Sequence, residues 1–384
     1  MSNKPAIRSL FLSFLRLGLT AFGGPAMVAY VKEMAVNSHK WLDEDKFKDG
    51  VALCQTIPGA TAMQTAAYVG LRARGVIGAL ASFVGFGLPA FILMLILSSL
   101  YAKYHAIPKV ISLFQGLQVV VVAIVANATY YFGKSTFRNY RDVFIAITAG
   151  ALFWTGVSPF AAIIGSACAG ALLMKSVTKS LSVRSEGIDR SFVKQFTVLL
   201  SVLLSGLVVL YLIDARLLNL AVLMTRIDLF AFGGGFASIP LMLHEIVNVR
   251  GWMDSKTFMD GIALGQVTPG PIVITSTFVG YMLYGVAGAT IATVGIFAPS
   301  FLMVIAVTPV FDRLKASAYF IGATKGILAS FVGLLFFVAV KFALAVPWDV
   351  MRVFVGVAAF AALLKKVDIL YVVVTAAVVS LLIF

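Results

Sequence analysis

The chain has 384 residues, of which 61% are hydrophobic and only 12% are charged, and its mean hydropathy is +1.01. A soluble globular chain carries about 25% charged residues, so this composition excludes a large soluble domain and indicates an all-α polytopic membrane protein. The formal net charge of +14 does not indicate nucleic-acid binding, because most basic residues lie in short loops between apolar runs.

Six apolar segments are predicted in the first half of the chain. The N-terminal one lacks a small-residue cleavage site and is interpreted as a retained span, not a signal peptide. The second contains Pro58 and Gly59, a pair that normally ends a helix. The last two are short, are joined by TGVSP, and favour a helical hairpin. The six segments are 8–31, 50–70, 75–101, 110–132, 143–156 and 159–174.

A basic hydrophilic linker over 175–195 precedes an apolar run over 196–213 that has no counterpart in the first half. At about 1.5 Å per residue, this run is long enough to span a membrane. Six further segments then follow, at 217–243, 261–281, 285–311, 321–344, 352–364 and 367–384.

The two halves are copies of each other. WLDEDKFKDGVALCQTIPG at 41–59 and WMDSKTFMDGIALGQVTPG at 252–270 share 10 of 19 residues, and FGGP at 22–25 matches FGGG at 232–235. The offset between matching residues stays at 210 or 211. A duplication therefore divides the chain into a first repeat (1–175), a linker with an unpaired helix (176–214) and a second repeat (215–384).

Because one unpaired helix separates two six-segment repeats, the second repeat begins on the opposite membrane face, as in many secondary transporters. We therefore predict about 13 segments, inverted repeats, and an N-in, C-out topology. This orientation places about twice as many lysines and arginines in the inside loops as in the outside loops. Re-entrant Pro-Gly segments would change the parity.

The FGGP motif, the run W-[LM]-D…F-x-D-G-x-A-L-x-Q, and the Pro-Gly pair followed by YVG…G-x-x-G-A resemble the chromate ion transporter family, in its long-chain form with two fused domains. The resemblance covers essentially the whole chain. It implies a carrier of the prokaryotic inner membrane that exports chromate using the proton motive force, with a link to sulfate, an isostructural dianion. Gly59-Ala60 stands where the second repeat has Gly270-Pro271, so the repeats need not contribute equally.

An anion inside a membrane needs hydrogen-bond donors and positive potential, and a helix interrupted at depth supplies both at its new N-terminus. The Pro-Gly and Phe-Gly-Gly breaks are therefore predicted to converge on a substrate site. The alternative is that they are kinks and packing glycines. The residues concerned are Gly23, Gly24, Pro25, Pro58, Gly59, Gly233, Gly234, Gly235, Pro269 and Gly270.

Side chains near the breaks are further candidates. Gln55, Gln64, Gln266 and Thr275 could donate to an anion without a fixed charge, or could satisfy the interrupted backbone. Arg16 and Arg226 occupy equivalent positions six residues before each Phe-Gly-Gly, and guanidinium groups bind oxyanions bidentately. Their alternatives are snorkelling or pairing with a carboxylate such as Asp228. Lys325, in an apolar span, is a third candidate cation.

Proton coupling needs a carboxylate or histidine whose protonation responds to its surroundings. The candidates are Glu33, Glu245, Asp49, Asp260 and His244, and the alternative is that they are loop-edge or capping charges. A proton antiporter would export the anion and a symporter would import it, and the sequence does not choose between them.

The pattern favours a secondary carrier over a passive channel, and no GxxxxGK[ST] loop indicates an ATP-driven pump. We predict no enzymatic activity, no cofactor and no metal, because Cys54, Cys168 and three scattered histidines form no catalytic or ligand motif. The predicted partners are a chromate- or sulfate-like dianion, protons and the bilayer, and no nucleic acid. The small-residue faces Gly261–Gly265 and Gly322–Gly326 suit either packing of one half against the other or a homodimer.

Overall fold

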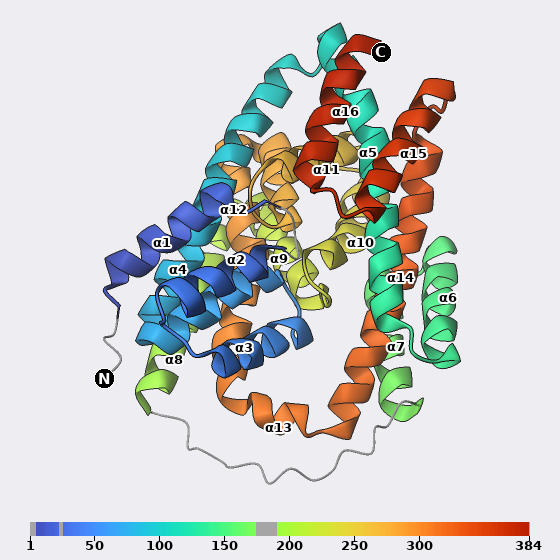
Figure 1. Cartoon of the computed structure of the whole chain (residues 1–384). Helices are drawn as coiled ribbons and strands as arrows, with labels where there is room; N and C mark the ends of the chain where they lie inside the picture. The colour runs from blue at the N-terminus through green and yellow to red at the C-terminus, as the bar shows by residue number, and fades with distance from the viewer. Residues whose placement is uncertain (1–4, 23–25, 174–189, 384) are drawn as a thin grey trace. The chain divides into compact units, whose positions relative to one another are not determined.

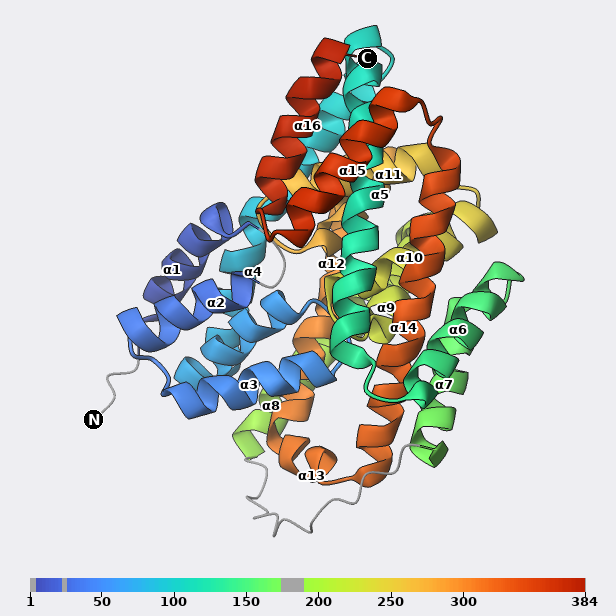
Figure 2. The ribbon, with the colours of Figure 1, turned by 45° about the vertical axis from the view of Figure 1, so that its right-hand side comes forward.

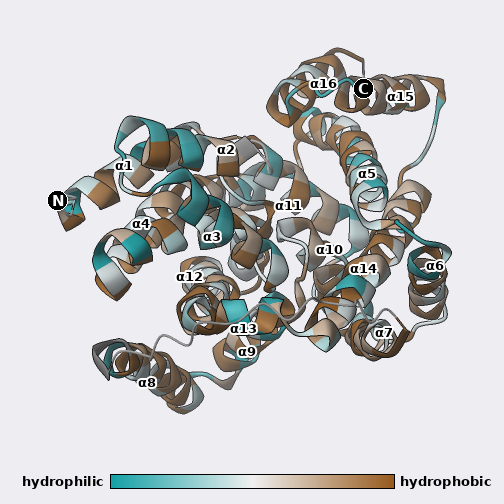
Figure 3. Cartoon of the chain, turned by 60° about the horizontal axis from the view of Figure 1, so that its bottom comes forward, coloured by the Kyte–Doolittle hydropathy of each residue, from teal (hydrophilic) through white to brown (hydrophobic). Residues whose placement is uncertain are grey.

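A computed structural model of the chain describes residues 5–22, 26–173 and 190–383. Throughout these ranges the regular structure is helical (Figure 1), which confirms the all-α prediction. Hydrophobic residues predominate along most helices, whereas α3 carries many hydrophilic residues (Figure 3). Within the described ranges, five helical stretches are long and apolar enough to cross a membrane. They are 61–104, 108–136, 193–213, 272–315 and 318–345. The prediction of a polytopic membrane protein therefore stands, and the count of 13 segments stays a prediction.

The first repeat is divided where the Gly- and Pro-containing motifs predicted interruptions. Residues 23–25, with the candidate residues Gly23, Gly24 and Pro25, lie outside the described ranges. The elements are α1 (Ile7–Thr20), α2 (Ala26–Lys32), a π-helical turn η1 (Glu33–Ser38), α3 (Glu44–Thr56), α4 (Thr61–Tyr104), α5 (Pro108–Thr136), α6 (Tyr140–Trp154) and α7 (Pro159–Leu173).

The second repeat has nearly the same order, and it follows the predicted extra helix, α8 (Arg190–Ile213). Its elements are α9 (Ala215–Phe230), η2 (Gly235–Ala237), α10 (Ser238–Met242), the π-helical turn η3 (Leu243–Val249), α11 (Ser255–Val267), η4 (Ile272–Ile274), α12 (Thr275–Val307), η5 (Thr308–Val310), α13 (Phe311–Lys315), α14 (Ala318–Ala345), α15 (Val350–Leu364) and α16 (Ile369–Ile383).

Helix α4 is a hairpin of two helical segments. The backbone leaves the helical region at Arg74 and at Gly75, where φ is 68°, and the Ser82 hydroxyl donates to the Ala66 carbonyl at 2.7 Å. Sixteen residues of straight helix would separate these two groups by about 24 Å, so the chain must fold back at Gly75. Helix α12 repeats the arrangement at Gly285, where φ is 60°.

The helices gather into two compact units, and neither unit corresponds to one repeat. The first unit comprises 1–95, 178–235 and 269–316, and the second comprises 96–177, 236–268 and 317–384. Each unit therefore draws on both repeats, although the sequence divides the chain into repeats that follow one another.

In the second unit the repeats exchange partners. Helix α14 packs against α6 and α7 of the first repeat, and the equivalent helix α5 packs against α15 and α16 of the second (Figures 1 and 2). Small residues permit this contact, because a Cβ at Gly326 would lie 2.1 Å from the Ser166 carbonyl oxygen. The Gly322–Gly326 face thus packs one half against the other, which was one of its two predicted uses. The predicted hairpin of α6 and α7 is also present.

Candidate functional site

The two Pro-Gly breaks are tied to the opposite repeats within the first unit. The Gly59 amide donates to the Ala231 carbonyl at 2.9 Å, and the Gly270 amide donates to the Ala21 carbonyl at 3.2 Å. Ala21 and Ala231 are themselves equivalent residues, each at the end of the helix that precedes a Phe-Gly-Gly motif. The hydrogen bonds are therefore reciprocal, and each repeat holds the interrupted segment of the other.

Glycine is required at both breaks by the backbone as well as by space. Gly59 has φ +116° and Gly270 has φ +119°, backbone angles that residues with a side chain rarely adopt. A Cβ at Gly59 would lie 1.9 Å from the Ser300 Oγ, and one at Gly270 would lie 2.8 Å from the Ala90 Cβ. Pro58 and Pro269 are buried, and each precedes its glycine in the non-helical segment between two helices.

The glycine-rich loop of the second repeat packs on the same place. Gly233 and Gly234 have φ values of 94° and 96°, and a Cβ on Gly234 would lie 3.2 Å from the Thr61 Oγ1 at the start of α4. A Cβ on Gly235 would lie 3.0 Å from side chains of Ile272 and Val273, just after the second break. Three of the four predicted breaks thus come together in the first unit, with the end of α1.

This assembly places helix N-termini around interrupted backbone. The first-turn amides of α4 have no acceptor four residues earlier within the helix, and the helix dipole is positive there. After the second break the 3-10 turn η4 comes first, and its carbonyl groups accept from the Thr275 amide at the start of α12. By contrast, the Gly59 and Gly270 amides already donate to carbonyl groups of the protein. Any anion held here would therefore be bound by first-turn amides and side chains, with the two glycines shaping the backbone.

A buried polar chain, which the motif analysis did not identify as a site, lies beside the first break. The Ala60 amide donates to the Ser300 Oγ at 3.1 Å, and the Ser300 hydroxyl lies 3.0 and 2.8 Å from the two carboxylate oxygens of Asp228. The side chain of Asp228 is buried, whereas that of Arg226 is exposed. Asp228 is thus bound by Ser300, where the sequence suggested Arg226 as its partner.

The candidate amides take different roles. The Gln64 Nε2 donates to the Pro58 carbonyl at 2.5 Å and so satisfies the interrupted backbone, one of the two roles considered from sequence. The Thr275 hydroxyl donates to the Ile272 carbonyl at 2.8 Å in the same way. Gln55 is exposed, whereas the Nε2 atom of Gln266 is buried and has no hydrogen-bond partner among the described residues. Gln266 therefore keeps a donor that a ligand could use.

The candidate cations lie on exposed faces. Arg16 on α1, Arg226 on α9 and Lys325 on α14 are all exposed side chains. Each arginine lies in the turns that precede a Phe-Gly-Gly break, so it is close in sequence to the assembled breaks. Their roles in binding remain predictions.

The coupling candidates separate by burial. Asp260 is buried in the second unit, where the Tyr101 hydroxyl and the Gln118 Nε2 each donate to it at 2.8 Å. Its equivalent in the first repeat, Asp49, is exposed. The other three candidates have partners of their own: Glu33 accepts from Asn37 at 2.5 Å, Glu245 pairs with Arg250, and His244 lies 5.7 Å from the Phe153 ring.

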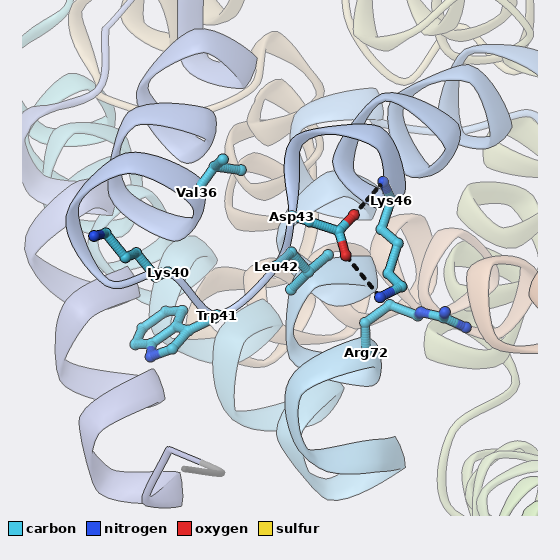
Figure 4. Close-up of a pocket in the computed structure, with 7 residues that line it drawn as sticks. All are labelled: Val36, Lys40, Trp41, Leu42, Asp43, Lys46 and Arg72. Carbon is cyan, nitrogen blue, oxygen red and sulfur yellow. Dashed lines mark hydrogen bonds and ion pairs between the residues drawn. The ribbon is translucent and has the colours of Figure 1, made fainter. Parts of the chain in front are cut away.

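A basic surface pocket of about 540 Å³ lies between η1, the start of α3 and α4 (Figure 4). Lys40, Lys46 and Arg72 line it, and Asp43 accepts hydrogen bonds from both the amide and the ammonium group of Lys46. These bonds hold the pKa of Asp43 below its usual value. The three cations align with Gly251, Thr257 and Met282 of the second repeat, so the basic pocket belongs to the first repeat alone.

Comparison with known proteins identifies the family. A family model described as chromate transporter matches residues 8–171 and again 218–381. An uncharacterized transporter of Methanocaldococcus jannaschii is 45% identical over 99% of this chain and 95% of its own length. The chromate transport protein of Pseudomonas aeruginosa is 29% identical over 92% of this chain and 85% of its own length. The chromate transport protein of Cupriavidus metallidurans is 28% identical over 85% of this chain and 80% of its own length.

No solved structure matches the chain. The sequence resemblance is nevertheless confirmed, because the family model covers most of the chain as two repeats and the relatives align over nearly its whole length. The chain belongs to the chromate transporter family, in the form that carries two repeats of the family domain.

Proposed function

We propose that this protein is a secondary active carrier that moves chromate, a tetrahedral dianion, across a prokaryotic inner membrane. The observation that carries the proposal is the reciprocal pair of hydrogen bonds from Gly59 to Ala231 and from Gly270 to Ala21. It builds one assembly of interrupted helices from both repeats, and discontinuous helices whose N-termini face an anion are a recurring transporter design. The substrate is taken from the names of the relatives in Pseudomonas and Cupriavidus.

Neutral donors suit this cargo. Helix N-terminal amides attract a dianion without a fixed charge that would hold it permanently. The basic pocket around Lys40 and Arg72 would raise the local concentration of anions at the protein surface. Sulfate has the same shape and charge, and its uptake or exchange is the alternative transport function.

The repeats are proposed to be inverted, with about 13 segments and the N-terminus inside. The exchanged contacts in both units support a symmetrical relation between the repeats, because each half holds the equivalent element of the other. Alternating access would then come from movement of symmetry-related segments about a shared site. A homodimer is not needed to complete this assembly, although it remains a prediction.

The proton motive force is proposed to drive export. Its electrical component alone expels anions from a negatively charged interior, by about 2.3 kcal/mol per charge for each 100 mV. Coupled proton movement would add to or oppose this force according to its direction. A passive channel, the less favoured alternative, would show no coupling to protons and no acceleration of flux by substrate on the far side.

The test is chromate flux in proteoliposomes of defined orientation, with a pH gradient and a membrane potential imposed separately and sulfate as competitor. Saturable flux that both gradients change and sulfate inhibits is the expected result. Flux that responds to membrane potential alone, without saturation, would support a channel. Sulfate transport without chromate transport would support the carrier mechanism and show that sulfate, not chromate, is the substrate.

Replacing Arg16 or Arg226 by alanine is expected to lower chromate transport about tenfold or more, because each removes a cation close in sequence to the assembled breaks. The matched control is Arg8→Ala, which removes an exposed arginine from the beginning of α1. Initial rates at equal protein in the membrane give the comparison. If both variants transport at the rate of the Arg8→Ala protein, neither arginine belongs to the substrate path.

Asp260→Asn is expected to weaken proton-driven flux severalfold, because a buried carboxylate that accepts from Tyr101 and Gln118 is replaced by a group that cannot ionise. Asp49→Asn changes the exposed equivalent residue and should leave the flux almost unchanged. Flux is measured under an imposed pH gradient. If the two changes had equal effects on flux, the burial of Asp260 would not distinguish it from Asp49 as a coupling residue.

A further inference from the structure

The first unit contains one buried carboxylate that the transport proposal does not use. Asp228 lies on α9 and is 1% exposed, and Ser300 on α12 donates to it. The groups that face Asp228 are this hydroxyl, the Ser300 backbone amide and, through the hydroxyl, the Ala60 amide of the first break. Among the described residues, no lysine, arginine, histidine or second carboxylate interacts with Asp228. Its charge is therefore balanced by neutral dipoles alone.

The duplication supplies an internal comparison, because the second break has the same backbone hydrogen bond without this polar chain. Gly18 aligns with Asp228, Ala90 with Ser300, and Pro271 with Ala60. The equivalents thus lack the carboxylate, the hydroxyl and the amide hydrogen, respectively. The packing is equivalent as well: Gly270 lies against Ala90 just as Gly59 lies against Ser300. All three members of the polar chain are therefore present together at one break and absent together at the other.

A structural role accounts poorly for this difference. The second break keeps its hydrogen bond from Gly270 to Ala21 without any such chain, so the fold does not need a carboxylate to hold a break in place. A buried charge without a cationic partner is also a costly way to stabilise a protein. In addition, the buried Oε1 of Gln64, a neighbour of Gly59, has no hydrogen-bond partner among the described residues. A buried acceptor of this kind calls for a bound donor.

We propose that Asp228 is a proton-binding site linked to the anion site, and that an anion enters the first break only when Asp228 takes up a proton from solvent. The inference rests on the proposed function of the assembled breaks as an anion site. When ionised, Asp228 orients the Ser300 hydroxyl and, through it, the Ala60 amide, so the protein's own carboxylate compensates the positive end of α4. A dianion at the same amides would face a like charge, and protonation of Asp228 removes that repulsion.

The linkage has a definite sign. Because binding of the anion takes up one proton, the affinity for the anion should fall as the pH rises, by about tenfold per pH unit once Asp228 is ionised in the free protein. The complex that crosses the membrane then carries one negative charge fewer than the dianion. An inside-negative membrane potential still drives it outward, whereas an inward pH gradient opposes the outward movement of its proton, so export in this scheme is powered by the electrical component of the proton motive force alone. The second break, which lacks the chain, contributes no proton.

The experiment measures binding of radiolabelled chromate to the purified full-length protein in detergent by equilibrium dialysis, from mildly acidic to mildly alkaline pH. The wild type should lose affinity as the pH rises. Asp228→Asn, which keeps the shape and stays neutral, should bind at alkaline pH as tightly as the wild type does at acidic pH. The chromate and its own titration are the same for both proteins, so the difference between them reports on Asp228.

Three further measurements make the result specific. Ser300→Ala, which introduces the residue of the other repeat, should move the pH at which affinity falls and keep the slope, because the carboxylate remains. Asp142→Asn, which changes a buried carboxylate that caps α6 in the second unit, should keep the wild-type profile. A pH-sensitive dye should report about one proton taken up per chromate bound by the wild type at alkaline pH, a measurement that needs no variant to fold.

The outcomes separate the inference from the function on which it rests. If the wild type binds chromate and Asp228→Asn keeps its pH dependence, or if Asp142→Asn abolishes it, the inference is wrong and the transport proposal stands. Absence of proton uptake by a wild type that binds chromate leads to the same conclusion. If the wild type binds neither chromate nor sulfate at any pH, both the proposed function and the inference fail.

Discussion

Gly59→Ala is expected to abolish chromate transport. The new Cβ would lie 1.9 Å from the Ser300 Oγ and 2.7 Å from the Gln64 Nε2, at a residue whose φ is +116°. Ser300 cannot turn away without losing its bonds to Asp228 and to the Ala60 amide, and Gln64 cannot turn away without releasing the Pro58 carbonyl. The strained φ alone costs about 1–3 kcal/mol, and the displaced polar groups add to it.

Alanine substitutions at two other glycines separate the effect of backbone strain from the effect of the steric clash. Gly75→Ala places a Cβ at φ 68° with no atom within 4 Å, so it reports the backbone strain without the clash and should reduce transport least. Gly270→Ala meets only the Ala90 Cβ, at 2.8 Å, and should be intermediate. Initial chromate flux per folded protein gives the order. Equal flux in the Gly59 and Gly75 variants would show that the packing around Ser300 does not control transport.

Gly333→Ala is expected to destabilise the whole protein and to lower its yield in the membrane. Gly333 lies on α14 of the second repeat, and a Cβ there would lie 1.9 Å from the Ala146 carbonyl oxygen on α6 of the first. A backbone atom cannot move aside as a side chain can, so the two helices must separate. Overpacking of a well-packed core costs about 1–3 kcal/mol, and occasionally more.

Gly165→Ala is the control for this effect. It adds the same methyl group on α7, where no atom lies within 4 Å of the new Cβ. Alanine is the better helix former by about 1 kcal/mol, so this variant should be as stable as the wild type or more stable. Thermal unfolding in detergent, followed by tryptophan fluorescence, measures both variants. A Gly333 variant as stable as the Gly165 variant would contradict the close packing of α14 on α6.

Much of the local structure could be predicted from the sequence. Pro58-Gly59 and Pro269-Gly270 end helices where Pro and Gly indicated, and the predicted apolar segment 110–132 lies inside α5 (Pro108–Thr136). The short segments at 143–156 and 159–174 form the α6–α7 hairpin. These features depend on neighbouring residues, namely turn formers and the length of apolar runs, and both are visible in a single sequence.

The partners of each segment could not be predicted in the same way. Repeat alignment shows that Gly59 and Gly270 are equivalent, but it does not show that each donates to the other repeat. That exchange depends on contacts between segments about 170 to 250 residues apart, which leave no local pattern. For the same reason the structural roles of Gln64 and Thr275 became visible only when their acceptor carbonyls were located.

Asp228 can be recognised in the sequence as a difference between the two repeats. Residues that the repeats share form visible motifs, whereas a polar residue that only one repeat carries forms no repeated pattern. Asp228 against Gly18 and Ser300 against Ala90 are two such places on different helices. Because Asp228 and Ser300 are in contact, these two differences belong to one candidate site.

The central claim, that this chain is a carrier for a chromate-like dianion, is tested most directly by counterflow. Proteoliposomes containing the wild-type protein are loaded with unlabelled chromate and diluted into a trace of labelled chromate. A carrier with alternating access is expected to accumulate label transiently above its equilibrium level, because the internal substrate returns the loaded site to the outside. Entry of label that internal chromate does not accelerate would contradict a carrier mechanism. Accumulation of labelled sulfate in sulfate-loaded vesicles, with no accumulation of labelled chromate in chromate-loaded vesicles, would contradict the substrate.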